Sequence, residues 1–271
     1  MSLMRPLASV HVQGGNVPGG HLVPWDGKRK PFITPMKECN SIPLRHSDVV
    51  VDIGAYVGTY AIRCARFPVK SVTAYEPTPR TFEILCKTDL PNLEIKQAAV
   101  VADNRQSVDL YVSKGIGVTN SIVKAERKAG AVEVPAVKYV DAVAGATVVK
   151  IDVEGAEYTY PIIQPGIRAL IIDFHPMAGR DWIARAEQMV GEITAAGFET
   201  VVKPDWSNGW TQAGSWMRDT SDDGSCCDVL MSGKMCCGCG KQTDGQGKTL
   251  CARCFDEWKP QHREGFDKCP S

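Results

Sequence analysis

The sequence lacks several features that would place it in a special class of protein. No apolar run approaches the ~18 residues of a membrane-spanning helix, so we expect no integral membrane protein and no membrane partner. Residues 1–10 lack the long apolar stretch of a secretory signal. We therefore expect a cytoplasmic protein, in the host cytoplasm if the chain is viral. Lys and Arg balance Asp and Glu at 31 each, so no excess of basic charge is present to coat nucleic acid.

Cysteine is scarce over most of the chain and dense near its C-terminus. Of 11 cysteines, only Cys39, Cys64 and Cys86 precede residue 226. Without a secretion signal, such a cluster is more typical of a metal site than of a disulfide framework. The 271 residues, 44% hydrophobic and 23% charged, otherwise have the composition of a globular protein with room for one large domain and an appendage.

Three segments with different sequence textures predict the domain organisation. Residues 1–46 are rich in Gly and Pro and have no helical period, so we expect a strand-and-turn extension that packs on the next domain. Residues 47–233 alternate apolar runs with helical stretches, which predicts an α/β fold: a mainly parallel sheet with helices on both faces. Residues 234–271 contain most of the cysteines and form the third, small module.

The 47–233 domain has nine runs that we expect to be strands and three that we expect to be helices. The expected strands are 49–53, 71–75, 93–97, 108–112, 132–137, 147–152, 169–174, 198–203 and 228–232, and the expected helices are 58–66, 79–87 and 181–196. Between the last two strands, residues 204–225 predict a long loop with three Trp, which is either functional or a packed surface flap.

A glycine-containing turn after the first strand predicts a cofactor site. The strand Val49–Ile53 carries Asp52 and leads into Gly-Ala-Tyr-Val-Gly, and Glu76 ends the second strand 24 residues after Asp52. An acid at that position can bind both hydroxyls of a ribose. A nicotinamide dinucleotide would favour a further glycine under its pyrophosphate, whereas an acid ahead of the turn suits a cationic ligand such as S-adenosylmethionine. We therefore favour S-adenosylmethionine, with cofactor-binding residues Asp52, Gly54, Ala55, Tyr56, Gly58, Glu76 and Pro77.

These motifs resemble those of the FkbM-type S-adenosylmethionine-dependent methyltransferases over about residues 47–233. The resemblance rests on the turn 52–58, on Glu76-Pro77 and above all on the octet Lys-Ile-Asp-Val-Glu-Gly-Ala-Glu at 150–157. Residues 137–141 and 171–176 also resemble the strand ends that flank this octet, whereas Tyr56 stands where the family usually has Asn. The resemblance implies a class I, Rossmann-like methyltransferase fold. It also implies methyl transfer, usually to an oxygen of a sugar or small molecule.

Acidic side chains and a histidine at the ends of later strands are the candidate catalytic residues. Methyl transfer needs donor and acceptor in line, and a hydroxyl acceptor benefits from a base. Asp152 closes the fourth parallel strand, Glu154 and Glu157 follow in the turn and an expected helix start, and His175 follows the next strand. We predict that Asp152 or His175 accepts the proton or orients the acceptor, and that Glu154 holds cofactor or substrate hydroxyls. For Glu157 a helix cap or surface position is favoured. The acids could instead hold a divalent cation, although their spacing does not require one.

The C-terminal module has the cysteine spacing of a structural metal site. Eleven residues separate Cys236-x-x-Cys239 from Cys251-x-x-Cys254, and four thiolates in a tetrahedron suit Zn²⁺. The module resembles zinc ribbons and treble-clef knuckles, and a segment this short needs the metal to fold. We expect it to mediate protein contacts or oligomerisation.

Three functions remain open from the sequence. The first is an enzyme that methylates a hydroxyl of a sugar or other small molecule. The second keeps the enzyme but makes nucleic acid the acceptor, at a ribose 2′-oxygen or a base, with the zinc module binding the substrate. The third is a zinc-bearing interaction protein with a degenerate methyltransferase fold. The basic run at residues 28–30 is the main feature outside the module that would favour nucleic acid.

Overall fold

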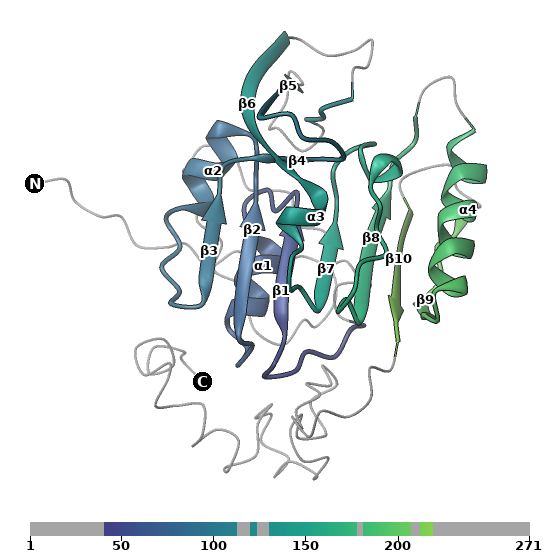
Figure 1. Ribbon diagram of the computed structural model, residues 1–271. Coiled ribbons are helices and arrows are strands. Elements are labelled where there is room, and N and C mark those ends of the chain that lie inside the picture. The colour runs from purple at the N-terminus through teal and green to yellow at the C-terminus, as the bar shows by residue number, and fades with distance from the viewer. Residues whose placement is uncertain (1–40, 113–119, 124–129, 178–180, 207–211, 219–271) are drawn as a thin grey trace, which may run out of the picture.

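A seven-stranded sheet forms the centre of the protein. The computed structural model describes residues 41–112, 120–123, 130–177, 181–206 and 212–218 (Figure 1). The strands lie in the order β3-β2-β1-β7-β8-β10-β9. Their bounds are β1 Val49–Ile53, β2 Ser71–Tyr75, β3 Leu93–Lys96, β7 Val148–Ile151, β8 Ala169–Phe174, β9 Glu199–Val202 and β10 Gln212–Met217. The β-branched and aliphatic runs of β1, β7 and β8 are buried on both faces, as parallel strands covered by helices require.

Strand directions complete the assignment of the fold. β3, β2, β1, β7 and β8 pair in parallel, and β10 pairs antiparallel with both β8 and β9. This is the mainly parallel sheet of the Rossmann-like class I methyltransferase fold, and the predicted fold class is confirmed for the described residues. The predicted zinc module lies outside the described residues.

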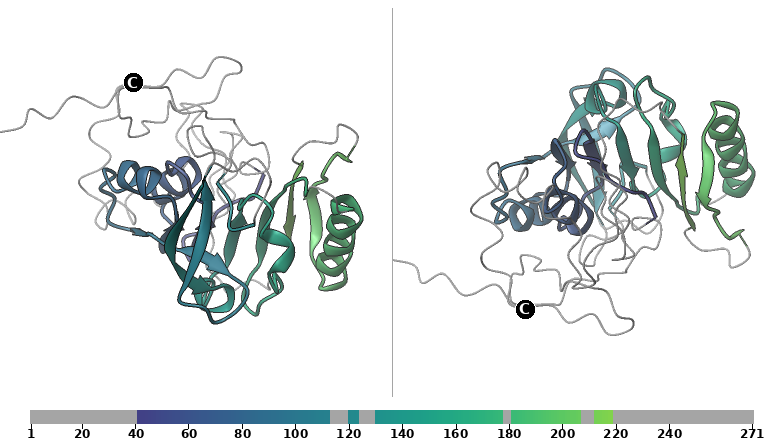
Figure 2. Two further views of the ribbon diagram at one scale, coloured as in Figure 1. Left: turned by 90° about the horizontal axis from the view of Figure 1, so that it is seen from above. Right: turned by 90° about the horizontal axis from the view of Figure 1, so that it is seen from below.

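Helices cover the sheet in two separate layers (Figure 2). One core cluster joins α1 (Thr59–Ala65) and α2 (Pro79–Leu85) to one face of the sheet, for example Ile62 and Leu85 to Val72. The other cluster joins α3 (Tyr139–Ala142), the 3-10 turn η2 (Glu157–Thr159) and α4 (Trp182–Ala195) to the opposite face. None of the helices among the described residues is long and apolar enough to cross a membrane.

A smaller sheet stands over the carboxyl ends of the parallel strands (Figure 1). Its order is β4-β6-β5, formed by β4 (Ala99–Val101), β5 (Ser107–Val112) and β6 (Gly130–Lys138). Tyr111 of β5 pairs with Ser121 through both backbone hydrogen bonds, so Ser121 lies antiparallel beside the end of β5. This brings residues 120–123 beside the loop after β7.

The segment before β1 packs at the amino ends of the parallel strands, away from the small sheet. Ile42 and Leu44 are buried in the core, and Asp48 is 1% exposed. The guanidinium of Arg168 donates to both carboxylate oxygens of Asp48 and to the carbonyl of Pro43. Residues 41–48 thus belong to the folded body, and the rest of the predicted 1–46 extension lies outside the described residues.

Two expectations about secondary structure are wrong. Residues 204–225 were expected to form one loop, but β10 (Gln212–Met217) lies within them and pairs on both edges. The small residues of β10 give it no visible strand pattern. Glycine is required at position 214, because a Cβ there would lie 2.5 Å from the Trp216 ring and 2.8 Å from Pro204. The helix expected after the octet is only the three-residue η2 turn. The expected strand 228–232 lies outside the described residues.

Candidate functional site

The turn after β1 packs directly against the loop after β7. Gly54 has φ +81°, and a Cβ there would lie 1.8 Å from the carbonyl oxygen of Asp152, so only glycine fits. The backbone N–H groups of Gly54 and Ala55 both donate to the carbonyl of Tyr75 at the end of β2. The turn therefore holds together the carboxyl ends of β2, β1 and β7, where the order of the sheet changes direction. Open α/β sheets bind their ligands at such a point.

Tyr56, at the tip of this turn, is one of two non-glycine residues with left-handed backbone in the described structure. Its φ is 54°, a region that Asn adopts more readily than Tyr. The conformation aims the Tyr56 N–H at Oε2 of Glu76, 2.7 Å away. Tyr56 therefore keeps the backbone turn that the resemblance implies, with a side chain that differs from the usual one.

Glu76 is almost completely buried beneath the turn, with 5% exposure. Its Oε1 accepts from the Thr78 N–H at 2.8 Å and the Thr81 hydroxyl at 2.7 Å, in addition to the bond from Tyr56 to Oε2. Burial raises the pKa of Glu76, and these donors oppose that rise. The Thr78 hydroxyl is a further donor to this carboxylate, so residues of the turn and of the start of α2 hold Glu76 in place.

Asp52 lies behind the turn with no exposed surface. Its Oδ2 accepts from the Ala61 N–H at 3.1 Å in the first turn of α1, and its Oδ1 lies 3.2 Å from Nζ of Lys150. Burial raises the pKa of the Asp52 carboxyl, and the Lys150 ammonium opposes this. Asp52 thus braces α1 and β7 against the turn from inside. Its direct contact with a cofactor stays a prediction.

Lys150 links Asp52 of β1 to Asp152 in the loop after β7. Its Nζ also lies 3.2 Å from Oδ2 of Asp152, and its side chain is only 5% exposed. For Asp152, burial favours the neutral acid, but Lys150 and His175 outweigh it and lower the pKa of the carboxyl. Asp152 is therefore an ionised carboxylate at ordinary pH, with a 28% exposed side chain.

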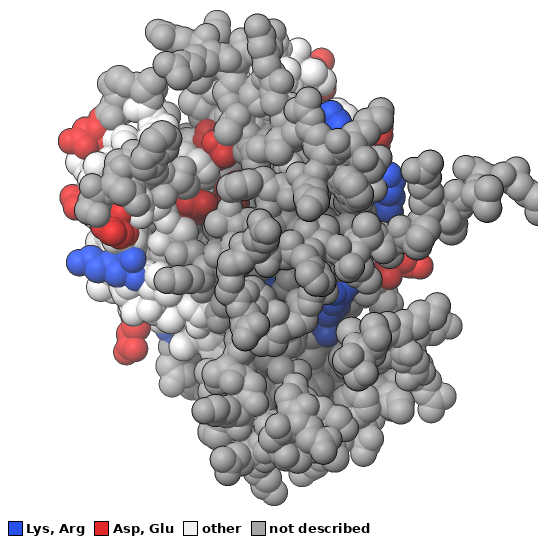
Figure 3. Space-filling model, turned by 180° about the vertical axis from the view of Figure 1, so that it is seen from behind, with Lys and Arg blue, Asp and Glu red and all other residues white. Residues whose placement is uncertain are grey.

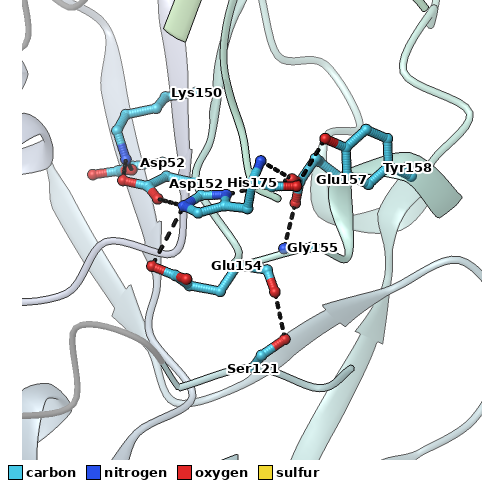
Figure 4. Close-up of polar contacts among 9 residues, drawn as sticks. All are labelled: Asp52, Ser121, Lys150, Asp152, Glu154, Gly155, Glu157, Tyr158 and His175. Carbon is cyan, nitrogen blue, oxygen red and sulfur yellow. Dashed lines mark hydrogen bonds and ion pairs between the residues drawn. The ribbon is translucent and has the colours of Figure 1, made fainter. Parts of the chain in front are cut away.

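His175 lies at the centre of a group of carboxylates (Figure 4). Its Nε2 lies 3.6 Å from Oδ1 of Asp152 and 3.4 Å from Oε1 of Glu154, and its Nδ1 lies 3.3 Å from Oε1 of Glu157. Burial alone would lower the pKa of His175, but Glu154 and Glu157 raise it well above its ordinary value. The candidate catalytic residues Asp152, Glu154 and His175 are thus brought together, as their positions at neighbouring strand ends indicated.

Three residues outside the predicted set of catalytic and cofactor-binding residues support this group. Glu157, expected as a cap or surface residue, is fully buried and accepts from the backbone N–H groups of Gly155 and His175 at 2.8 and 2.7 Å. The Ser121 hydroxyl donates to the carbonyl of Glu154 at 2.6 Å and reaches the site from the small sheet. Burial, with the nearby charge of Asp152, raises the pKa of Asp173 to about 7. An acid within the apolar run of β8 was the available signal for Asp173.

The remaining predicted site residues divide into two sets. Gly58, with φ +86°, ends the turn against Leu85 and Ile62, and Pro77 follows Glu76 directly, so both lie with the residues that we expect to bind the cofactor. The predicted metal ligands lie outside the described residues: Cys236, Cys239, Cys251 and Cys254.

Comparisons with known proteins find likenesses of structure but none of sequence. No protein-family model matches the chain, and no curated protein matches it. A precorrin-6y C5,15-methyltransferase from Geobacter metallireducens is similar over 68% of this chain and 86% of its own, with 10% identity and a TM-score of 0.39. A putative S-adenosylmethionine-dependent methyltransferase from Listeria monocytogenes is similar over 68% and 97%, with 11% identity and a TM-score of 0.38.

A third similar structure, fibrillarin from Aeropyrum pernix with bound S-adenosyl-L-methionine, has 10% identity, a TM-score of 0.38 and coverage of 65% and 69%. Likenesses at this level say nothing of the substrate of this chain.

Proposed function

We propose that this protein transfers a methyl group from S-adenosylmethionine to a hydroxyl oxygen. The observation that carries the proposal is the meeting of two groups where the strand order turns, between β1 and β7. The glycine turn and Glu76 lie on the β2 side, and Asp152, Glu154 and His175 lie on the β8 side. A cofactor half and a reacting half on neighbouring strand ends are what transfer between two bound molecules requires.

The residues of the cofactor half fit S-adenosylmethionine. Glu76 is held in place at the end of β2, the position from which an acid can bind the hydroxyls of a ribose. The nearby carboxylates of Asp152 and Glu154 favour a cationic sulfonium over a pyrophosphate, which they would repel. When bound, the group would supply the methyl carbon; the chain would bind its ribose through Glu76 and its backbone turn.

On the reacting side, the carboxylates are better placed than His175 to receive a proton. His175 holds its own proton among three acids, so its ring serves to position Asp152 and Glu154. Asp152 and Glu154 keep partly exposed oxygens that can accept a hydrogen bond from an acceptor hydroxyl. We therefore assign Asp152 as the group that orients the hydroxyl and takes its proton, with Glu154 beside it.

The narrower assignment to FkbM-type enzymes that act on a sugar or small molecule is part of this proposal. It is supported by the octet 150–157, in which Lys150, Asp152, Glu154 and Glu157 all contribute to one charge network. Each charged residue of the octet thus has a defined contact in the network.

Binding of S-adenosylhomocysteine to the full chain tests the cofactor half. Glu76→Gln should weaken binding about tenfold or more, because one of the two carboxylate oxygens becomes an amide NH₂ group, which cannot accept from the turn or from a ribose hydroxyl. The matched control is Glu83→Gln, an exposed glutamate of α2, which should bind like the unmodified chain. Isothermal titration measures both affinities, and circular dichroism checks folding. A folded chain that gives no heat at millimolar ligand would refute the proposal.

A nucleic-acid acceptor receives little support from the described charges. The site contains more acids than bases, and a polyanion would be repelled: Asp52, Asp152, Glu154, Glu157 and Asp173 surround Lys150 and His175. On the face in Figure 3, the described Lys and Arg that are visible lie among Asp and Glu. Filter binding with a salt titration separates the two acceptors, since phosphate contacts make affinity fall steeply with salt.

We also propose that Cys236, Cys239, Cys251 and Cys254 bind one structural Zn²⁺. The support is the spacing of the two Cys-x-x-Cys pairs in the sequence. A closed four-thiolate shell has no open position for substrate, so its role is to fold a module for protein contacts.

A further inference from the structure

Three ligand atoms of the reacting half converge on one point. Among the described residues, Asp152, Glu154 and His175 each offer one ligand atom, and these atoms all lie within 4.8 Å of one another. Nε2 of His175 lies 3.6 Å from the Asp152 oxygen and 3.4 Å from the Glu154 oxygen. Two ligands that bind one cation at about 2.1 Å lie roughly 3.0–3.4 Å apart, so both distances from His175 are at this range or within a few tenths of an ångström of it.

The orientation of His175 is that of a metal ligand rather than of a surface ion pair. The side chain is only 8% exposed. Nδ1 faces the buried carboxylate of Glu157 at 3.3 Å, which leaves Nε2 aimed at Asp152 and Glu154. Histidine ligands commonly have a carboxylate behind the other ring nitrogen, which fixes the tautomer and the ring.

Both carboxylates are held with one side toward His175 and one side open. Lys150 binds Oδ2 of Asp152, so Oδ1 is the oxygen that faces the ring. Glu154 has left-handed backbone, with φ 57°, and its carbonyl is fixed by the Ser121 hydroxyl. The side chains of Asp152 and Glu154 are 28% and 25% exposed, which leaves room for further ligands from solvent or substrate.

We propose that Asp152, Glu154 and His175 bind a divalent cation of the Mn²⁺ type. The site offers one imidazole nitrogen and two carboxylate oxygens. Carboxylate oxygens suit Mn²⁺, whereas a set of thiolates would select Zn²⁺. The cation would replace the proton of His175 as the positive charge shared by Nε2 and the two carboxylates. If the proposed methyl transfer is correct, an acceptor hydroxyl on the open side would bind the cation, which would lower the pKa of the hydroxyl so that its proton passes to solvent, and Asp152 would then act as a ligand instead of the base.

Titration of the full chain with Mn²⁺, followed by electron paramagnetic resonance of the free ion, tests the site. We expect a saturable Mn²⁺ site whose affinity falls at least about tenfold in both Glu154→Gln and Asp152→Asn. The control Glu187→Gln removes an exposed carboxylate of α4 and should leave the affinity unchanged. Electron spin-echo modulation of the bound ion should contain the signal of an imidazole nitrogen. Circular dichroism checks that each variant is folded.

The outcomes separate this inference from the proposed function. No Mn²⁺ bound at millimolar concentration by the folded chain, or equal affinity in all three variants, overturns the cation site. Mn²⁺ binding without the imidazole signal overturns the role of His175. A chain that binds Mn²⁺ as expected but gives no heat with S-adenosylhomocysteine keeps the cation site and loses the methyltransferase proposal. A chain that binds S-adenosylhomocysteine but no Mn²⁺ keeps the methyltransferase proposal and loses the cation site.

Discussion

At the scale of single residues, unusual backbone conformations direct the polar groups of the site. Tyr56 and Glu154 have φ of 54° and 57°, which costs about 1–2 kcal/mol for a residue with a Cβ. In each case a neighbour secures the strained residue: Glu76 accepts from the Tyr56 N–H, and Ser121 donates to the Glu154 carbonyl. Strain of this kind persists where the surroundings fix it, which is common at functional sites.

Gly54→Ala should destabilise the protein severely. The added Cβ would meet the Asp152 carbonyl at 1.8 Å in addition to its left-handed strain at φ +81°. We expect a loss of more than about 3 kcal/mol in the free energy of unfolding. Gly145→Ala is the control, because Gly145 has φ +74° with no atom within 4 Å, so it shares only the strain and should lose about 1–2 kcal/mol. Urea unfolding measures both, and equal losses would contradict the close approach.

Part of the site could be predicted residue by residue, and part could not. Asp152 and His175 follow neighbouring parallel strands, and strand order alone brings such positions together. The burial of Glu157 could not be predicted, because it depends on the single turn η2 that replaces an ordinary crossover helix. The pairing of Lys150 with both Asp52 and Asp152 was also missed, since a lysine in a buried strand shows its partner only in three dimensions.

At the scale of elements, strands were predicted where their residues are β-branched and aliphatic. The bounds of β8 coincide with the expected 169–174, and α4 begins and ends within one residue of the expected 181–196. β10 was missed because Gly214 and Ser215 give it no apolar alternation. β4 was missed because three residues are too short for a periodic signal. Tertiary contacts, not local propensity, make strands of these two segments.

The contact between the segment before β1 and the start of β8 predicts a large stability effect. Arg168→Met would leave the buried Asp48 carboxylate without its guanidinium, so we expect a loss of about 3–5 kcal/mol. Arg185→Met breaks an exposed pair with Glu192 and should cost no more than about 1 kcal/mol. Urea unfolding measures the free energy of unfolding of both variants.

Adding Asp48→Asn to Arg168→Met should recover part of the loss, because the unpaired charge is then gone. An Arg168→Met protein as stable as the Arg185→Met protein would show that the buried pair is not what fastens this segment.

At the scale of the whole molecule, we predict that methyl transfer and zinc binding are separable, because they depend on different segments of the chain. Every described residue of the site lies between 52 and 175, whereas the four predicted zinc ligands lie beyond residue 235. A degenerate methyltransferase fold that serves only as an interaction protein would bind zinc but have no activity to lose at Asp152. Loss of methyl transfer in Asp152→Ala, with activity retained in a chain cut after Ser232, would exclude that third function.

Zinc content tests the cysteine-rich segment directly. Elemental analysis of the full chain should find about one zinc per molecule, and Cys236→Ser combined with Cys251→Ser should release it, because each change removes one ligand of a four-thiolate shell. Cys86→Ser changes an exposed thiol of the described domain and should leave the zinc in place. Affinity for S-adenosylhomocysteine should be the same in all three proteins if the module is only structural. A zinc-free chain, or a cofactor affinity that falls with the zinc, would mean that the module is absent or is coupled to the site.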